Sequence, residues 1–104
     1  MYVVIYVTAE SPEQAKKIAK TLVEERLAAC VNVVERVHSV YWWEGRVQEA
    51  EEALLVVKSL KSLVDRVAER VKELHTYTVP EVVAVEVCGG NRDYLRWVSE
   101  ECAE

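Results

Sequence analysis

The chain has 104 residues, of which 51% are hydrophobic and 30% charged, and its formal net charge is −5. This composition is typical of one soluble globular domain (residues 1–104), and it opposes nucleic acid as a partner, because phosphate binding needs clustered Lys and Arg. No apolar run approaches the ~18 residues of a membrane span, and the first ten residues lack the basic flank of a secretory signal. We therefore expect a cytoplasmic protein without a membrane partner.

The N-terminal residues predict a strand followed by a capped helix. Residues 2–7 (YVVIYV) form an unbroken β-branched and aromatic run, which is typical of a central strand. Ser11, Pro12 and Gln14 then supply an N-cap, a proline at the first helical position and a capping-box partner. The apolar residues that follow recur at helical spacing, so an amphipathic helix is expected here.

A long β-hairpin is predicted next. Residues 30–43 have a period of two, return through a tight Glu44-Gly45 turn, and continue as residues 47–58. A regular hairpin of this kind places His38 opposite Glu51 and Trp42 opposite Val47. The alternation predicts Val31, Val33 and Val37 on one face, and Val34 and Val40 on the other.

The remaining pattern predicts a second helix over residues 60–74, a strand over residues 82–87 and a short last helix that begins after the capping residue Asn91. The resulting order, β-α-β-β-α-β-α, is the split βαβ pattern of an α+β ferredoxin-like sandwich with an extra C-terminal helix. Each hairpin arm is longer than the helices that cover the sheet, so the hairpin must protrude.

Two adjacent tryptophans lie near the tip of this hairpin. Trp42 and Trp43 must point to opposite faces of their strand, so a core on one side can cover only one of them. A closed oligomer would cover both, and we expect Tyr41, Trp42 and Trp43 at its interface. The alternative is an isolated flexible hairpin with exposed indoles.

Five segments of the chain resemble one known family. They are ERLAACVNV (25–33), YWWEG (41–45), LLVVKS (54–59), ELHTYTVPEVV (73–83) and NRDYLRWV (91–98). In this order they are similar to the CutA divalent-cation-tolerance family. The resemblance implies a ferredoxin-like homotrimer that is similar to PII signalling proteins, and a link to copper or other divalent cations.

His75 and Cys30 are the metal-ligand candidates. The resemblance associates a histidine at the His75 position with metal binding and places Cys30 near a cavity between subunits. A neutral imidazole suits Cu(II), and a thiolate suits Cu(I). The alternatives are that His75 caps the preceding helix and that Cys30 is a small buried apolar residue. A nucleophile and base pair formed by these two residues would require that they be adjacent.

A ligand cleft is the second candidate site. Lys58 ends a buried apolar run and must reach either solvent or an anion. With Tyr77, Glu81, Trp43 and Tyr94 it resembles the lining of the family's cleft between subunits, which predicts a small anionic or mixed-charge ligand. The alternative is a structural network within a trimer.

The predicted function is that of a non-enzymatic homotrimer that senses or buffers divalent metal, with copper or another divalent cation as its only cofactor and no organic cofactor. The sequence contains no GxSxG, HExxH or P-loop motif that would indicate a catalytic site. A PII-like regulatory module that binds a small metabolite and a structural scaffold trimer are the alternatives.

Overall fold

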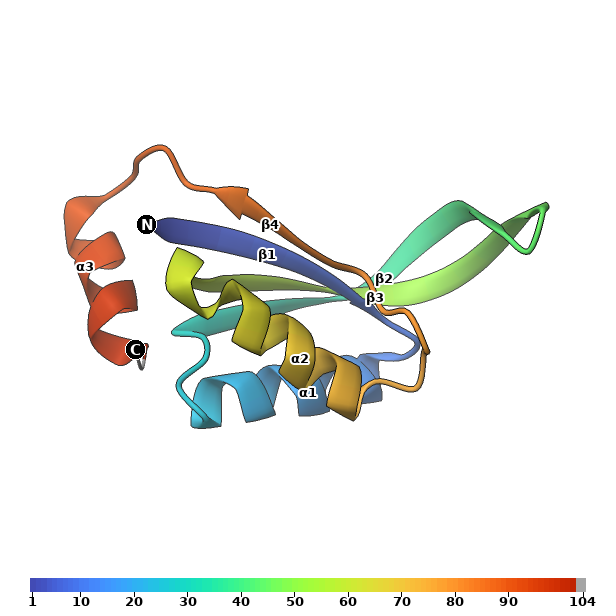
Figure 1. Cartoon of the computed structure of the whole chain (residues 1–104), viewed down its shortest axis with the longest axis horizontal. Helices are drawn as coiled ribbons and strands as arrows, with labels where there is room; N and C mark the ends of the chain where they lie inside the picture. The colour runs from blue at the N-terminus through green and yellow to red at the C-terminus, as the bar shows by residue number, and fades with distance from the viewer. Residues whose placement is uncertain (103–104) are drawn as a thin grey trace.

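The computed structural model describes residues 1–102 and contains the predicted order of elements. The elements are β1 (Tyr2–Ala9), α1 (Pro12–Glu24), β2 (Cys30–Trp43), β3 (Arg46–Leu60), a 3-10 turn (Lys61–Leu63), α2 (Val64–Leu74), β4 (Val82–Glu86) and α3 (Arg92–Glu101). The strands form one antiparallel sheet in the order β2-β3-β1-β4 (Figure 1). This topology confirms the ferredoxin-like α+β prediction. Residues 103–104 of the predicted domain lie outside the described residues.

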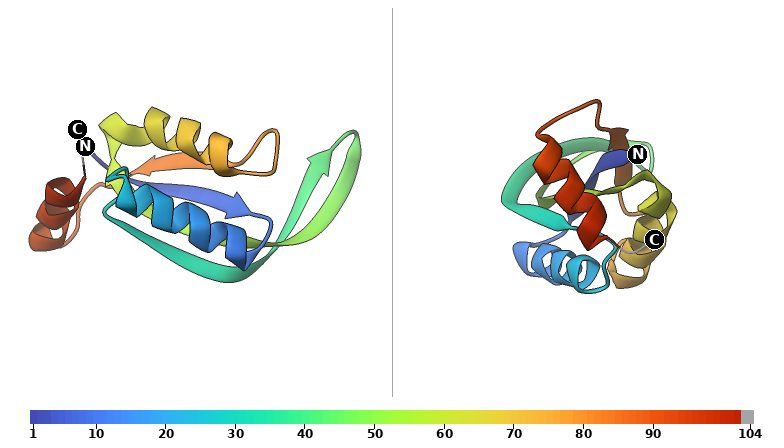
Figure 2. Two further views of the ribbon diagram at one scale, coloured as in Figure 1. Left: turned by 90° about the horizontal axis from the view of Figure 1, so that it is seen from below. Right: turned by 90° about the vertical axis from the view of Figure 1, so that its left-hand side faces the viewer.

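The hydrophobic core lies between the sheet and the two helices α1 and α2, which cover the same face (Figure 2). Alternate residues of β1 point into it, and α1 and α2 contribute residues at helical spacing. The Ser11 hydroxyl accepts a hydrogen bond from the Gln14 backbone N–H at 3.1 Å, which confirms the predicted start of α1. The core members on these three elements are Val3, Ile5, Val7, Ala9, Ala15, Ile18, Leu22, Val67 and Val71.

The hairpin of β2 and β3 extends beyond the helices (Figure 1). His38 pairs with Glu51 and Trp42 pairs with Val47, as predicted. The predicted faces of Val37 and Val40 are wrong, because a register irregularity between Val34 and Val37 adds one residue to β2. Val37 therefore shares the face of Val34, and Val40 lies on the face of Val31 and Val33.

Within residues 1–102, neither α1 nor α2 lies over the opposite face of the sheet, and α3 reaches only the end of it near Tyr2 and Lys58 (Figure 2). We call this opposite face the open sheet face, and it is largely apolar. Tyr6, Val34, Val83 and Val85 are 38 to 51% exposed in the single chain, which is unusual for residues of a sheet centre. By strand pairing its members include Val4, Tyr6, Cys30, Asn32, Val34, Leu54, Val56, Lys58, Val83 and Val85, and Thr8, Val37 and Glu52 continue the same face toward the hairpin.

Candidate functional site

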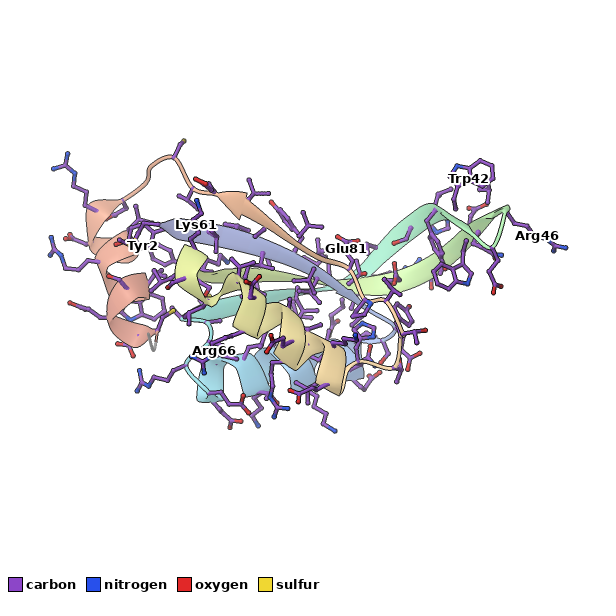
Figure 3. All side chains as sticks on the ribbon, viewed as in Figure 1. Tyr2, Trp42, Arg46, Lys61, Arg66 and Glu81 are labelled. Atoms are coloured by element: carbon purple, nitrogen blue, oxygen red, sulfur yellow. The ribbon has the colours of Figure 1, made fainter. Side chains whose placement is uncertain are left out.

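A cleft of about 560 Å³ lies at the base of the hairpin. The hairpin strands form one side, and the segment between α2 and β4 forms the other. Figure 3 shows Glu81 at this junction, whereas Trp42 and Arg46 lie near the far tip. The cleft is lined by Thr8, Ser39, Val40, Tyr41, Trp43, Glu52, Tyr77, Thr78, Val79 and Glu81.

Two carboxylates and a phenol give the cleft its chemistry. Glu52 is only 9% exposed, and one of its oxygens, Oε2, accepts a hydrogen bond from the Tyr77 hydroxyl at 3.0 Å. Burial, together with Glu52, raises the pKa of Tyr77 to about 12, so the phenol remains a donor at neutral pH. Burial and the nearby Glu52 charge also raise the pKa of Glu81. Negative charge is therefore concentrated here.

Replacing Tyr77 by phenylalanine should lower the free energy of unfolding by about 1–3 kcal/mol, because it leaves the buried Glu52 carboxylate without its phenolic donor. The measurement is urea unfolding at a fixed protomer concentration. Tyr41→Phe is the matched control, since Tyr41 lines the same cleft and is 41% exposed. Equal stabilities of the two variants would contradict a role for the Tyr77 hydroxyl.

His75 lies beside this cleft, at the end of α2, and is buried. Its Nδ1 accepts a hydrogen bond from the Tyr77 backbone N–H at 3.0 Å, so Nε2 carries the proton and donates to the Thr8 carbonyl oxygen at 2.7 Å. The Tyr77 ring also lies against the imidazole, with 4.4 Å between centroids. Both ring nitrogens thus have partners within the chain, and a metal could bind only by displacing one.

Cys30, Lys58 and Tyr94 lie together at the other end of the sheet. Cys30 pairs with Lys58 across β2 and β3, and the Lys58 ammonium donates to the Asn32 side-chain oxygen. Burial raises the pKa of Tyr94, with a further contribution from the Cys30 thiol to which it is hydrogen bonded. Lys58 and Tyr94 line a separate pocket of about 200 Å³ next to α3.

The two predicted metal ligands do not meet within one chain. Cys30 pairs with Lys58 of β3, which in turn pairs with Val4 of β1. His75 contacts Thr8, four residues further along β1. At ~3.3 Å per residue this is an offset of about 13 Å along the strand direction alone, and Cys30 also lies two strands away from β1. Among residues 1–102, no three His, Cys, Asp or Glu side chains gather closely enough to hold a metal ion.

The five predicted cleft residues also separate into two places. Trp43, Tyr77 and Glu81 line the cleft at the hairpin base, and Lys58 and Tyr94 line the smaller pocket. The larger cleft therefore contains carboxylates without the lysine that was expected beside them. The cleft therefore suits a ligand whose charge differs from that of the predicted anionic or mixed-charge ligand.

Glu52 is the main site residue that the sequence prediction missed. Glu52 follows two other glutamates, Glu49 and Glu51, yet it has the same strand parity as Leu54 and Val56 and lies beside Tyr77. The alternation within β3 alone could have shown that Glu52 continues an apolar face. Thr8 and Ser39, which also line the cleft, gave no comparable signal.

The predicted interface residues on the hairpin are exposed in the single chain. Tyr41 is 41%, Trp42 74% and Trp43 49% exposed. Trp43 and Tyr41 line the cleft, whereas Trp42 lies on the other face of β2. Burial between subunits of Trp42, and of the parts of Tyr41 and Trp43 that face away from the cleft, stays a prediction.

The fold and its clefts define a small α+β sandwich with a protruding hairpin, an open apolar sheet face and an acidic aromatic cleft. No helix within residues 1–102 combines the length and hydrophobicity that crossing a membrane requires. The family described as "CutA1 divalent ion tolerance protein" matches residues 3–101, and the chain belongs to this family.

Relatives of known name agree with this membership. The divalent-cation tolerance protein CutA of Thermus thermophilus is 53% identical over 97 residues, which are 93% of this chain and 94% of that protein. Protein CutA 1, chloroplastic, of Oryza sativa is 47% identical over 98% of this chain, which spans only 58% of that longer protein. The first of these names describes tolerance to divalent cations, and neither names a catalysed reaction.

Solved structures have the same fold. The divalent cation tolerance protein from Thermus thermophilus superposes with a TM-score of 0.97 at 50% identity, covering 99% of this chain and all of that one. CutA1 from Oryza sativa superposes with a TM-score of 0.96 at 47% identity, covering 99% and 94%. The hairpin, the sheet and the three helices are therefore features of the family.

Proposed function

We propose that the protein is a non-enzymatic homotrimer that binds divalent cations, copper among them, and so senses or buffers them. Family membership supports the class of ligand. The open sheet face supports the assembly, because a contiguous apolar surface of this kind is stabilised when a second copy covers it. A cytoplasmic location belongs to the same proposal and is supported by three cysteines without a disulfide spacing.

The observation that carries the metal proposal is the position of Cys30. Its partly exposed thiol lies on the open sheet face, where a second copy would meet it. Since one chain gathers no group of three ligands within residues 1–102, other subunits must complete the coordination. His75 is the second ligand that the sequence predicts. Because both of its ring nitrogens already have hydrogen-bond partners within the chain, we propose Cys30 as the ligand and a structural role for His75.

Native mass spectrometry with Cu(II), then Cu(I), under a competing chelator should show three bound ions per trimer. Cys30→Ala should abolish this binding, because it removes the accessible soft ligand. Cys88→Ala is the matched control and should leave the stoichiometry unchanged, since Cys88 is an exposed cysteine outside the strands, in the segment between β4 and α3. A trimer that takes up no copper would contradict the metal proposal.

A second candidate function is favoured by the cleft at the hairpin base. Its volume of about 560 Å³ lies within the range of small-molecule sites, and polar groups converge at one place in it. We propose on this ground that the protein is a regulatory module that binds a small organic ligand. A trimer that binds neither metal nor organic ligand would be a structural scaffold.

A further inference from the structure

The cleft at the hairpin base has two chemically different parts. The carboxylates of Glu52 and Glu81 mark one part, where the Tyr77 hydroxyl also lies. The rings of Tyr41 and Trp43 mark the other, and Val40 and Val79 add aliphatic surface to it. A ligand that fills the cleft must therefore combine a group complementary to carboxylates with an apolar portion.

The carboxylates have no counter-ion within residues 1–102. No Lys, Arg or His of this part of the chain forms an ion pair with Glu52 or Glu81. Glu52 is nine-tenths buried and, among the residues that the structure describes, is hydrogen bonded only to the neutral Tyr77 phenol. A buried carboxylate is costly unless a positive charge compensates it, so a cation in the cleft is stabilised by both carboxylates.

The lining favours an organic cation over a metal ion. Mg²⁺ and Ca²⁺ require six or more oxygen ligands. The cleft has two carboxylates and the hydroxyls of Thr8, Ser39, Tyr77 and Thr78, but its aromatic and aliphatic walls offer a metal ion no ligand. An alkylammonium group instead donates three hydrogen bonds to carboxylates and hydroxyls. Its alkyl stem can lie on the Tyr41 and Trp43 rings, whose faces also attract positive charge.

We propose that this cleft binds a primary alkylammonium ion, the aminoalkyl end of a small organic amine, with Glu52 and Glu81 as acceptors. This inference rests on the second candidate function and names its class of ligand. It replaces the anionic or mixed-charge ligand that the sequence predicted, since Lys58 lies six residues from Glu52 along β3, about 20 Å away.

The test is an NMR titration of the full chain with n-butylammonium, following the two indole N–H signals of the hairpin. The Trp43 signal should shift with saturation, and the Trp42 signal should not, because Trp42 lies on the opposite face of β2. Glu81→Gln should weaken the binding roughly tenfold or more, since it removes a charge-assisted acceptor. Glu69→Gln, which removes an exposed carboxylate from α2, should bind like the unmodified chain.

Butyrate and MnCl₂ separate the possible failures. Saturable shifts of Trp43 with butyrate but not with butylammonium would keep the cleft as a small-molecule site and overturn its assignment to a cation. Mn²⁺ is paramagnetic, so broadening of the Trp43 signal with MnCl₂, without an effect of butylammonium, would overturn the organic ligand in favour of a metal. A Trp43 signal that butylammonium, butyrate and MnCl₂ all leave unchanged would overturn both this inference and the second candidate function. Copper binding at Cys30 would be unaffected.

Discussion

The His75→Ala variant should lose about 2–4 kcal/mol of unfolding free energy and retain the copper that Cys30 binds. The imidazole is buried and satisfies two backbone groups, the Thr8 carbonyl and the Tyr77 N–H. Alanine would leave both without partners and open a cavity where the ring stood, and each of these effects destabilises the folded state. The ring also supports Tyr77, so the donor to Glu52 should become less fixed.

The measurement is urea unfolding at one protomer concentration, with copper uptake followed in parallel, because the stability of an oligomer depends on concentration. His38→Ala is the matched control. His38 is an exposed histidine that pairs with the exposed Glu49 on the hairpin, at 2.7 Å, and such surface pairs contribute about 0–1 kcal/mol. If His75→Ala unfolded like His38→Ala and had lost copper, His75 would be a metal ligand instead of a structural residue.

The sequence predicted the elements well because each carried a local physical signal. The N-cap at Ser11 fixed the start of α1, and the turn at Glu44-Gly45 fixed the hairpin register up to His38. Glu44 and Gly45 both have positive φ, which the short turn requires and which glycine adopts without strain.

The faces of β2 beyond Val34 could not be predicted in the same way. The extra residue before Val37 interrupts strict alternation, and no glycine or proline at this point signals it. The consequence reaches the site, because the shifted phase directs Ser39, Tyr41 and Trp43 toward the cleft. Local sequence patterns also could not predict the distance between Cys30 and His75, because it depends on which residue of β1 each of them lies beside.

Tyr6→Glu should have the largest effect of any single substitution considered, because a charge on the open sheet face should abolish the proposed trimer. Tyr6 lies in the middle of this face, between Val56 of β3 and Val83 of β4, and is 38% exposed in the single chain. A carboxylate here would stay hydrated in the monomer. In the trimer it would be buried without a partner, at a cost of about 3 kcal/mol or more at each interface.

A cost of this size weakens each contact by roughly 10² or more, so the variant should sediment at the mass of one chain, 11.9 kDa, where the unmodified protein sediments at three times this mass. Val23→Glu is the matched control. Val23 is 41% exposed and apolar, and the change adds the same charge on α1, away from the open sheet face. A Tyr6→Glu protein that kept the trimer mass would show that the open sheet face is not buried between subunits, and the position argued for Cys30 would then fail with it.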